Sequence, residues 1–237
     1  MTDTTERRVT SRWRTVFDIG STVAMLALAG VIAWQGRARL SGSAKGATLE
    51  ALVPSEPIAI TTSLKRGTHD AKVAIIEFAD FECPSCAQFN RETEPALVKE
   101  YVDTGKVVLV FKNFPLASHP GAEPAARAAW CAGEQQKFGE LHDWMYRLRG
   151  LQESDFQFGA KQLGLDMSRY EACRTSDRAK QSVDADRSEG ERLKIPGTPT
   201  FFVGKVLSDG RVQVTSSFVG SRKIEEVRQI VDKVIGG

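Results

Sequence analysis

The sequence predicts an α/β domain with a helical insertion, preceded by an N-terminal transmembrane helix. Three observations support this prediction: an apolar stretch at residues 15–34, two short apolar runs at 73–79 and 107–114, and a helical stretch between those runs. Short runs rich in Val and Ile are typical of buried strands, and a strand–helix–strand order is typical of parallel pairing. We therefore expect residues 58–237 to form one α/β domain.

The composition is typical of a globular protein and argues against nucleic-acid binding. Of the 237 residues, 41% are hydrophobic and 26% are charged, and the formal net charge is only +2. Basic residues between positions 187 and 194 are interleaved with acidic ones, which indicates a solvated helix face rather than a phosphate-binding track. We expect no nucleic-acid partner.

The apolar stretch at residues 15–34 has the length of a membrane span. Twenty helical residues cover roughly 30 Å, the thickness of the hydrocarbon core of a bilayer. Asp18 is its one charge, and Trp13 and Trp34 flank it as interfacial aromatic residues do. The segments expected are a cytoplasmic N-terminus at 1–14, a transmembrane anchor at 15–35 and a linker at 36–57.

A cleaved signal peptide is the alternative interpretation of the same stretch, with Ala27-Leu28-Ala29 as a candidate cleavage site. Under the first interpretation the domain is held at the extracytoplasmic, periplasmic side of the cell membrane by a single span. Under the second it is secreted or periplasmic. Both interpretations place the cysteines in a compartment where disulfides persist.

The remaining elements of the domain follow from helix and turn signals. A helix is expected over residues 84–103, because Pro84 suits a first helical turn, and Pro95 is expected to kink it. Ala-rich and charged patterns then predict three or four helices as an insertion at about 118–194. The last expected elements are strands at 200–203 and 212–215, a turn at 208–210 between them, and an amphipathic helix at 221–234.

Cys83 and Cys86 lie at the first strand-to-helix junction, three residues apart. The thiolate is the nucleophile in disulfide exchange, and the free N–H groups and dipole at a helix N-terminus favour that anion. We expect Cys83 to attack and Cys86 to resolve the mixed disulfide.

The alternatives for the Cys83–Cys86 pair are a structural bridge and a metal site. A zinc site needs four ligands, and the sequence has neither a second C-x-x-C nor an H-x-x-x-H pair, so we expect no metal.

Two further residues are candidates for the same site. Glu77 lies in the first apolar run, where burial near the cysteines would raise its pKa and allow it to relay a proton. The alternative is that Glu77 points to solvent from an edge. Pro199 directly precedes the strand at 200–203, so it begins that strand or occupies a special bend.

The motif Phe78-x-x-Phe81-x-Cys83-Pro84-x-Cys86, together with Gly197-Thr198-Pro199-Thr200, resembles the DsbA-like branch of the thioredoxin superfamily. The segment from Phe114 to Asp143 adds to this resemblance. The resemblance implies a thioredoxin fold and a cis peptide bond before Pro199, opposite the active-site disulfide. It also implies that the backbone beside Pro199, at Thr198, pairs with substrate peptides.

The same resemblance implies a protein disulfide oxidoreductase, a dithiol oxidase that needs no cofactor. Its partners would be reduced or unfolded exported proteins and a quinone-linked thiol oxidase in the membrane. A reductase or isomerase that is kept reduced is one alternative, and a non-enzymatic metal-binding module is another.

The chain also departs from the strongest oxidases of the family, which carry His between the cysteines. Here Pro84 and Ser85 take that place, with Asp80 and Glu82 just upstream, so we expect a weaker oxidant.

The two remaining cysteines, Cys131 and Cys173, are expected to form a second, structural disulfide that closes the helical insertion. Both lie in helical patterns without charged neighbours typical of a reactive thiol. In an oxidising compartment, two free thiols would exchange with Cys83. The alternative is that each is an ordinary buried cysteine.

Overall fold

A computed structural model describes residues 52–68, 70–148 and 150–237. The expected cytoplasmic segment 1–14, the anchor or signal at 15–35 and most of the linker at 36–57 lie outside the described residues. Within the described residues, no helix combines the length and the apolar character that a bilayer crossing requires.

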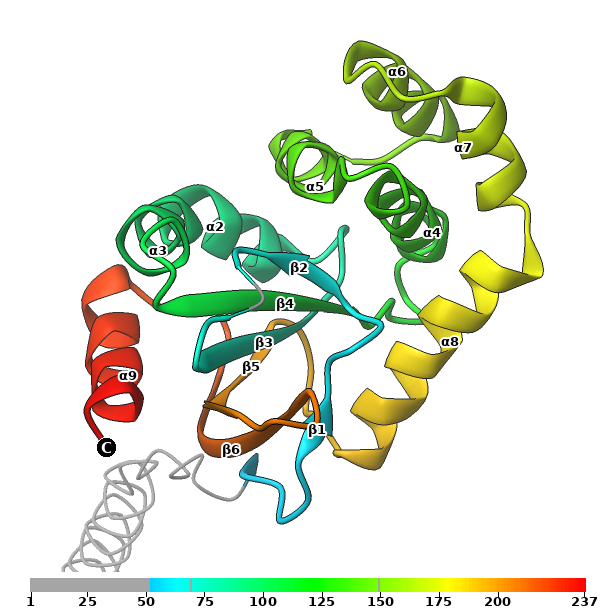
Figure 1. The fold of residues 1–237 in the computed structure, drawn as a ribbon. Helices are drawn as coiled ribbons and strands as arrows, with labels where there is room; N and C mark the ends of the chain where they lie inside the picture. Colours follow the sequence, from blue (N-terminus) through cyan, green and yellow to red (C-terminus); the bar gives the residue numbers. More distant parts are fainter. Residues whose placement is uncertain (1–51, 69, 149) are drawn as a thin grey trace, which may run out of the picture. The chain divides into compact units, whose positions relative to one another are not determined.

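In the part of the chain that the structure describes, a mixed sheet of six strands forms the centre of the domain (Figure 1), in the order β1-β6-β5-β3-β4-β2. Its two central strands, β3 (Val73–Ala79) and β4 (Val107–Asn113), pair in parallel, as the strand–helix–strand pattern predicts. Every residue of both strands is buried. This burial on both faces explains why they appear in the sequence as continuous apolar runs rather than as alternating patterns.

The hairpin of β5 (Thr200–Val206) and β6 (Arg211–Val219) adds antiparallel strands to β3, and both strands are longer than predicted. A β-bulge interrupts the β5–β6 register between Val203 and Gly204. A Cβ atom at position 204 would lie 2.1 Å from the carbonyl oxygen of Gln213, so only glycine allows this close approach. Two edge strands, β1 (Ile58–Ala59) and β2 (Leu64–Arg66), were not predicted, because two or three residues are too few to show a period.

The helical region after β3 is divided into three parts: α2 (Pro84–Glu92), α3 (Glu94–Leu97) and a π-helical turn, η2 (Val98–Val102). The sequence predicts one helix over this region, kinked at Pro95. The break falls at Thr93, because Pro95 lacks the N–H group that would continue the hydrogen-bond ladder of α2.

Helices cover both faces of the sheet. Odd-numbered residues of β3 such as Val73 and Ile75 pack with α2, α3 and α9 (Ile224–Gly236), whereas Ala74, Ile76 and Phe78 face the opposite side. Helix α8 (Asp177–Arg192) lies against that second side, and Figure 1 shows the sheet between α9 and α8. A Cβ atom at Gly190 of α8 would lie 2.5 Å from the ring of Phe114, so this glycine lets α8 approach closely.

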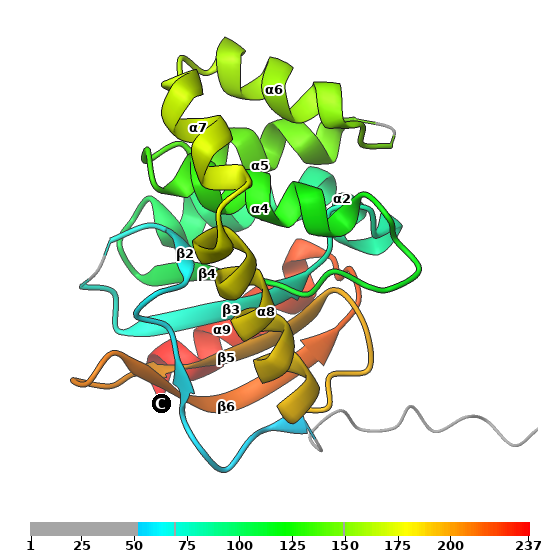
Figure 2. The same ribbon diagram turned by 90° about the vertical axis from the view of Figure 1, so that its right-hand side faces the viewer.

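Four more helices, α4 to α7, form a separate cap beside the end of the sheet that carries α2. Figure 2 shows α6 and α7 stacked above α4 and α5, away from the strands. With α8, the described residues between β4 and β5 form five helices, where the sequence predicts three or four. The bounds of the cap helices are α4 (Ala122–Gly133), α5 (Phe138–Arg147), α6 (Glu153–Gln162) and α7 (Met167–Arg174).

A disulfide joins Cys131 of α4 to Cys173 of α7, with 5.8 Å between the two Cα atoms. The two cysteines are 42 positions apart in the sequence, so the bond encloses α5 and α6. It ties α7 to α4 across the cap.

Candidate active site

Cys83 and Cys86 occupy the first turn of α2, directly after the central strand β3. Cys83 is the N-cap residue of α2, and Pro84 takes the first helical position, where its missing N–H group has no helical partner to lose. Both thiols are free in this structure. The side chains differ in access: Cys83 is 7% exposed, whereas Cys86 is fully buried. An attacking thiol must be reached by the substrate, whereas a resolving thiol can stay buried, so the difference in exposure fits Cys83 as the attacking and Cys86 as the resolving residue.

The two thiols also differ in acidity. The pKa of Cys83 falls to about 5, chiefly because the Cys86 thiol donates a hydrogen bond to the Cys83 sulfur. Burial acts in the opposite direction. The Thr198 side chain and the amides of Cys86 and Ser85 lower the pKa further. Burial raises the pKa of Cys86 well above its usual range, and the bond to Cys83 and the nearby Glu77 carboxyl raise it further. At neutral pH the reduced site therefore holds one thiolate, on Cys83, and one proton, on Cys86.

The residues around Pro199 lie opposite Cys83. The Thr198–Pro199 peptide bond is cis. In the thiol form, the sulfur of Cys83 donates a hydrogen bond to the carbonyl oxygen of Thr198, 3.2 Å away. The Thr198 hydroxyl is buried and has no partner among the described residues. A thiolate needs a hydrogen-bond donor, and the carbonyl oxygen of Thr198 can only accept a hydrogen bond. The Thr198 hydroxyl can donate one, so it is this group that can stabilise the thiolate.

Glu77 is 2% exposed in the middle of β3, where its backbone pairs with Phe111 of β4 and Phe201 of β5. The alternative position at a solvent-facing edge is therefore wrong. Burial raises the pKa of Glu77 well above its usual range; Glu94 and Cys83 add to this effect and Arg66 opposes it. Burial thus favours the protonated form of this carboxyl, which can serve as a proton donor to Cys86. In its ionised form the same carboxyl raises the pKa of Cys86 through its charge.

A cluster of charged side chains lies beyond Glu77, and sequence reasoning missed it. Arg66 of β2 binds Glu94 of α3 at 3.0 Å and Asp143 of α5 at 2.8 Å. His142 binds Asp143 at 3.0 Å. Burial acts to raise the pKa of Asp143, but His142 and Arg66 outweigh it and hold that pKa at about 2.

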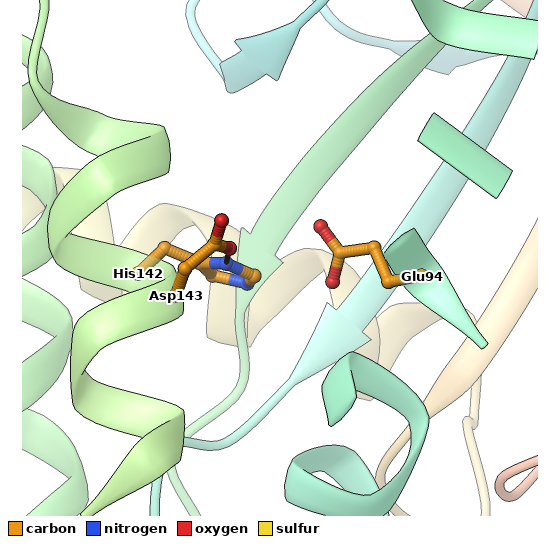
Figure 3. A group of neighbouring side chains, drawn as sticks. All are labelled: Glu94, His142 and Asp143. Atoms are coloured by element: carbon orange, nitrogen blue, oxygen red, sulfur yellow. Dashed lines mark hydrogen bonds and ion pairs between the residues drawn. The ribbon is translucent and has the colours of Figure 1, made fainter. Parts of the chain in front are cut away.

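Figure 3 shows Glu94 facing His142 and Asp143 across a short gap, and potential ligand atoms of these three residues lie within 4.8 Å of one another. Arg66 already pairs with both carboxylates, and the amide of Asn90 donates to Glu94 at 2.9 Å and to Asp143 at 3.3 Å. Both carboxylates of the cluster are thus already bound by an ion pair with Arg66 and a hydrogen bond from Asn90. Neither Cys83 nor Cys86 belongs to a group of three potential ligands within the described residues.

Asp80 and Glu82, just before the cysteines, anchor the loop between β4 and α4. One oxygen of Asp80 accepts from the amide of Leu116 at 2.8 Å and binds His119 at 2.9 Å. Glu82 accepts from the amide of Gly121 at 2.7 Å. These carboxylates are therefore occupied by a neighbouring loop, and the pKa of Cys83 lies at about 5 in their presence.

Comparison with known proteins agrees with this geometry. The family model described as "Thioredoxin" matches residues 60–233. The chain belongs to the thioredoxin family. Its fold is that of alpha-DsbA1 from Wolbachia pipientis (TM-score 0.66, 21% identity, 76% of this chain and 94% of that one). It also matches BdbD from Bacillus subtilis (TM-score 0.62, 22% identity, 77% of this chain and 100% of that one). The predicted resemblance to DsbA-like proteins is confirmed.

Relatives by sequence carry two kinds of name. The "Probable disulfide bond formation protein D" of Bacillus anthracis is 28% identical over 65% of this chain and 76% of that protein. The "Na(+)/H(+) antiporter NhaA 1" of Salinispora arenicola is 34% identical over 78% of this chain. The chain spans only 29% of the length of that antiporter, so the likeness concerns one part of it.

Proposed function

We propose that this thioredoxin-family protein is a protein disulfide oxidoreductase, a dithiol oxidase that donates a Cys83–Cys86 disulfide to reduced, newly exported proteins. The observation that carries the proposal is the opposite displacement of the two thiol pKa values, to about 5 for Cys83 and well above the usual range for Cys86. A strongly stabilised thiolate on Cys83 favours the reduced enzyme. It therefore makes the oxidised enzyme a good acceptor of electrons.

In the proposed reaction, a substrate thiolate attacks the sulfur of Cys83 in the oxidised enzyme. The Cys83–Cys86 bond breaks, a mixed disulfide forms, and Cys86 leaves with the electron pair. Cys86 takes up a proton, which we assign to the carboxyl of Glu77 because burial raises the pKa of that group and so favours its protonated form. A second substrate thiolate then attacks the substrate sulfur of the mixed disulfide. Cys83 departs as a thiolate, and the substrate disulfide is complete.

Thr198 and Pro199 are assigned to substrate binding. The carbonyl oxygen of Thr198 lies 3.2 Å from the sulfur of Cys83, so a peptide paired with this backbone would bring its cysteine to the attacking sulfur.

After the reaction, the enzyme needs an oxidant for the two thiols of Cys83 and Cys86. By analogy with the DsbA-like resemblance, we assign this role to a quinone-linked thiol oxidase in the membrane.

The expected membrane anchor at residues 15–35 belongs to the same proposal, with the domain on the extracytoplasmic side. Washing membranes with alkaline carbonate should leave the full-length protein in the pellet. Release into the wash, together with a mature N-terminus beyond about residue 29, the end of the candidate cleavage site, would favour the cleaved signal instead.

The competing function is a reductase or isomerase, which would use the same residues but rest in the reduced state. The resting state in cells separates the two functions. Free thiols are alkylated in intact cells before lysis. The alkylated and disulfide forms of the Cys83–Cys86 pair are then counted by mass. A mostly oxidised pair is expected for the oxidase. A mostly reduced pair would assign the protein to the isomerase or reductase class.

A further inference from the structure

Three segments meet around the first turn of α2, and hydrogen bonds join them. They are the Cys83–Cys86 motif, the bend at 197–199 and the loop at 220–223 between β6 and α9. The amide of Ser221 donates to the hydroxyl oxygen of Ser85 at 3.1 Å. The amide of Gly220 donates to the carbonyl oxygen of Pro199 at 2.8 Å. The 220–223 loop is therefore held to the redox motif and to the cis-proline bend at the same time.

A third bond holds the far end of this loop. The hydroxyl of Thr93, at the break between α2 and α3, donates to the carbonyl oxygen of Arg222 at 2.6 Å. Thr93 is 2% exposed, so this bond is sheltered from water. The Ser85 bond is more accessible than the Thr93 bond, because Ser85 and Ser221 are both half-buried. Because Ser85 stands between Cys83 and Cys86 in the sequence, this bond attaches the loop directly to the redox motif.

The Ser85 hydroxyl is not among the groups that hold the thiolate. The groups that lower the pKa of Cys83 are the Cys86 thiol, the Thr198 side chain and the backbone amides of Cys86 and Ser85. Ser85 thus contributes its amide to the sulfur and its side chain to Ser221. The residue between the cysteines has two separate roles, one in redox chemistry and one in loop geometry.

The backbone of two of these segments borders open space. A Cβ atom added at Gly197 or at Gly220 would meet no atom within 4 Å. Gly220 has a φ angle of 79°, a conformation that glycine adopts without strain. An extended peptide can therefore approach the partly exposed backbone at Gly197 and at Gly220.

We propose that Ser85 is a positioning residue for substrate binding: its hydroxyl holds the 220–223 loop beside Pro199 as the second wall of the peptide site. The ligand class is an extended polypeptide segment that carries the reacting cysteine. This inference rests on the proposed oxidase function and adds a side to its substrate site. Loss of the hydroxyl frees the loop and weakens peptide binding, while the sulfur of Cys83 keeps all of its own partners.

The test compares Ser85→Ala with Ser85→Thr, which keeps a hydroxyl, and with Ser168→Ala, which makes the same change at an exposed serine in the cap. The assay follows oxidation of a peptide with two cysteines by the oxidised enzyme. We expect Ser85→Ala to raise KM about two- to tenfold, the size of one lost hydrogen bond, with little change in kcat. Ser85→Thr and Ser168→Ala should keep the parental KM. The pKa of Cys83, read from thiolate absorbance, should be the same in all four proteins.

Two results would overturn the inference. One is an unchanged KM in Ser85→Ala. The other is a displaced Cys83 pKa in that variant, whatever its KM, because the hydroxyl would then act through the sulfur. Failure of the parent enzyme to oxidise the peptide is a different result, since it contradicts the proposed function itself. Equal thermal unfolding midpoints of parent and Ser85→Ala show that the comparison concerns binding rather than folding.

Discussion

The sulfur of Cys83 lies 3.2 Å from the carbonyl oxygen of Thr198, a residue 115 positions later in the sequence. This contact joins the start of α2 to the bend before β5. The carbonyl oxygen accepts a hydrogen bond from the thiol, and the free hydroxyl of the same residue is available to the thiolate. Thr198 can thus contact the sulfur in both protonation states.

Replacement of Thr198 by Val should therefore raise the pKa of Cys83. Valine keeps the shape of threonine but removes the hydroxyl that stabilises the thiolate, while the backbone carbonyl remains. The measurement is the thiolate absorbance of the reduced enzyme as a function of pH. A pKa that stays at about 5 in the variant would show that the hydroxyl does not act on the sulfur.

The stability of the reduced enzyme should rise relative to that of the oxidised enzyme between about pH 5 and about pH 8.5. The folded pKa of Cys83 is about 5, and the unfolded value is about 8.5. Because the folded pKa is the lower one, the stabilisation is fully present above the unfolded value. It is lost as the pH falls through the folded value. In the oxidised enzyme neither sulfur of the pair titrates.

Urea unfolding of both redox forms at several pH values measures this difference in unfolding free energy. A difference that stays flat across the window would contradict the lowered pKa of Cys83. The Cys83→Ala variant serves as a control, because Cys86 alone, with its raised pKa, keeps its proton across the window in the folded state.

Replacement of Glu77 by Gln should slow thiol transfer, by about tenfold or more if Glu77 supplies the proton to Cys86. Glutamine keeps the shape of the side chain but cannot release a proton. Single-turnover oxidation of a dithiol peptide at several pH values measures the effect. A rate equal to that of the parent at every pH would remove Glu77 from the mechanism.

The same variant should be more stable than the parent at neutral pH. The folded pKa of Glu77 is raised above its unfolded value of about 4.3, so burial of this carboxyl costs stability once the pH exceeds that value. The gain in unfolding free energy of Glu77→Gln should be absent near pH 4 and grow toward pH 7. A constant difference over that range would show that the parental carboxyl does not titrate abnormally.

Removal of the second disulfide by the double change Cys131→Ser and Cys173→Ser should destabilise the domain. The bond joins residues 42 positions apart. For a loop of that size, the chain-entropy estimate of the stabilisation is about 4 kcal/mol as an upper figure. Thermal and urea unfolding of the oxidised proteins measures the loss. A double variant as stable as the parent would show that the bond does not stabilise the domain.

The parts of the fold that the sequence predicts are those with local causes. Strands β3 and β4 are buried on both faces, so their apolar runs stand out, and Cys83 and Cys86 are recognisable from their spacing and their place before a helix. The cluster of Arg66, Glu94 and Asp143 has no such local signal. Its members come from β2, α3 and α5, and only tertiary folding brings them together.

The Ser85–Ser221 bond escapes sequence analysis for the same reason, because its partners are 136 residues apart and one of them is a backbone amide.

The environment of Glu77 is only partly predictable from the sequence. Its position in an apolar run predicts burial, but the run alone does not distinguish a central strand from an edge. The strand order places β3 between β5 and β4, and this central position is what buries the carboxyl.

The central claim is that Cys83 exchanges disulfides with exported proteins and that Cys86 resolves the intermediate. The most direct measurement compares Cys86→Ala with Cys83→Ala, each expressed as the full chain in cells and trapped with acid and an alkylating agent. Without the resolving thiol, mixed disulfides between Cys83 and client proteins should accumulate as reducible, higher-mass species. The Cys83→Ala protein should form none, because its remaining thiol is fully buried and has a raised pKa. Mixed disulfides on Cys86 in the Cys83→Ala protein, with none in the Cys86→Ala protein, would contradict the assignment.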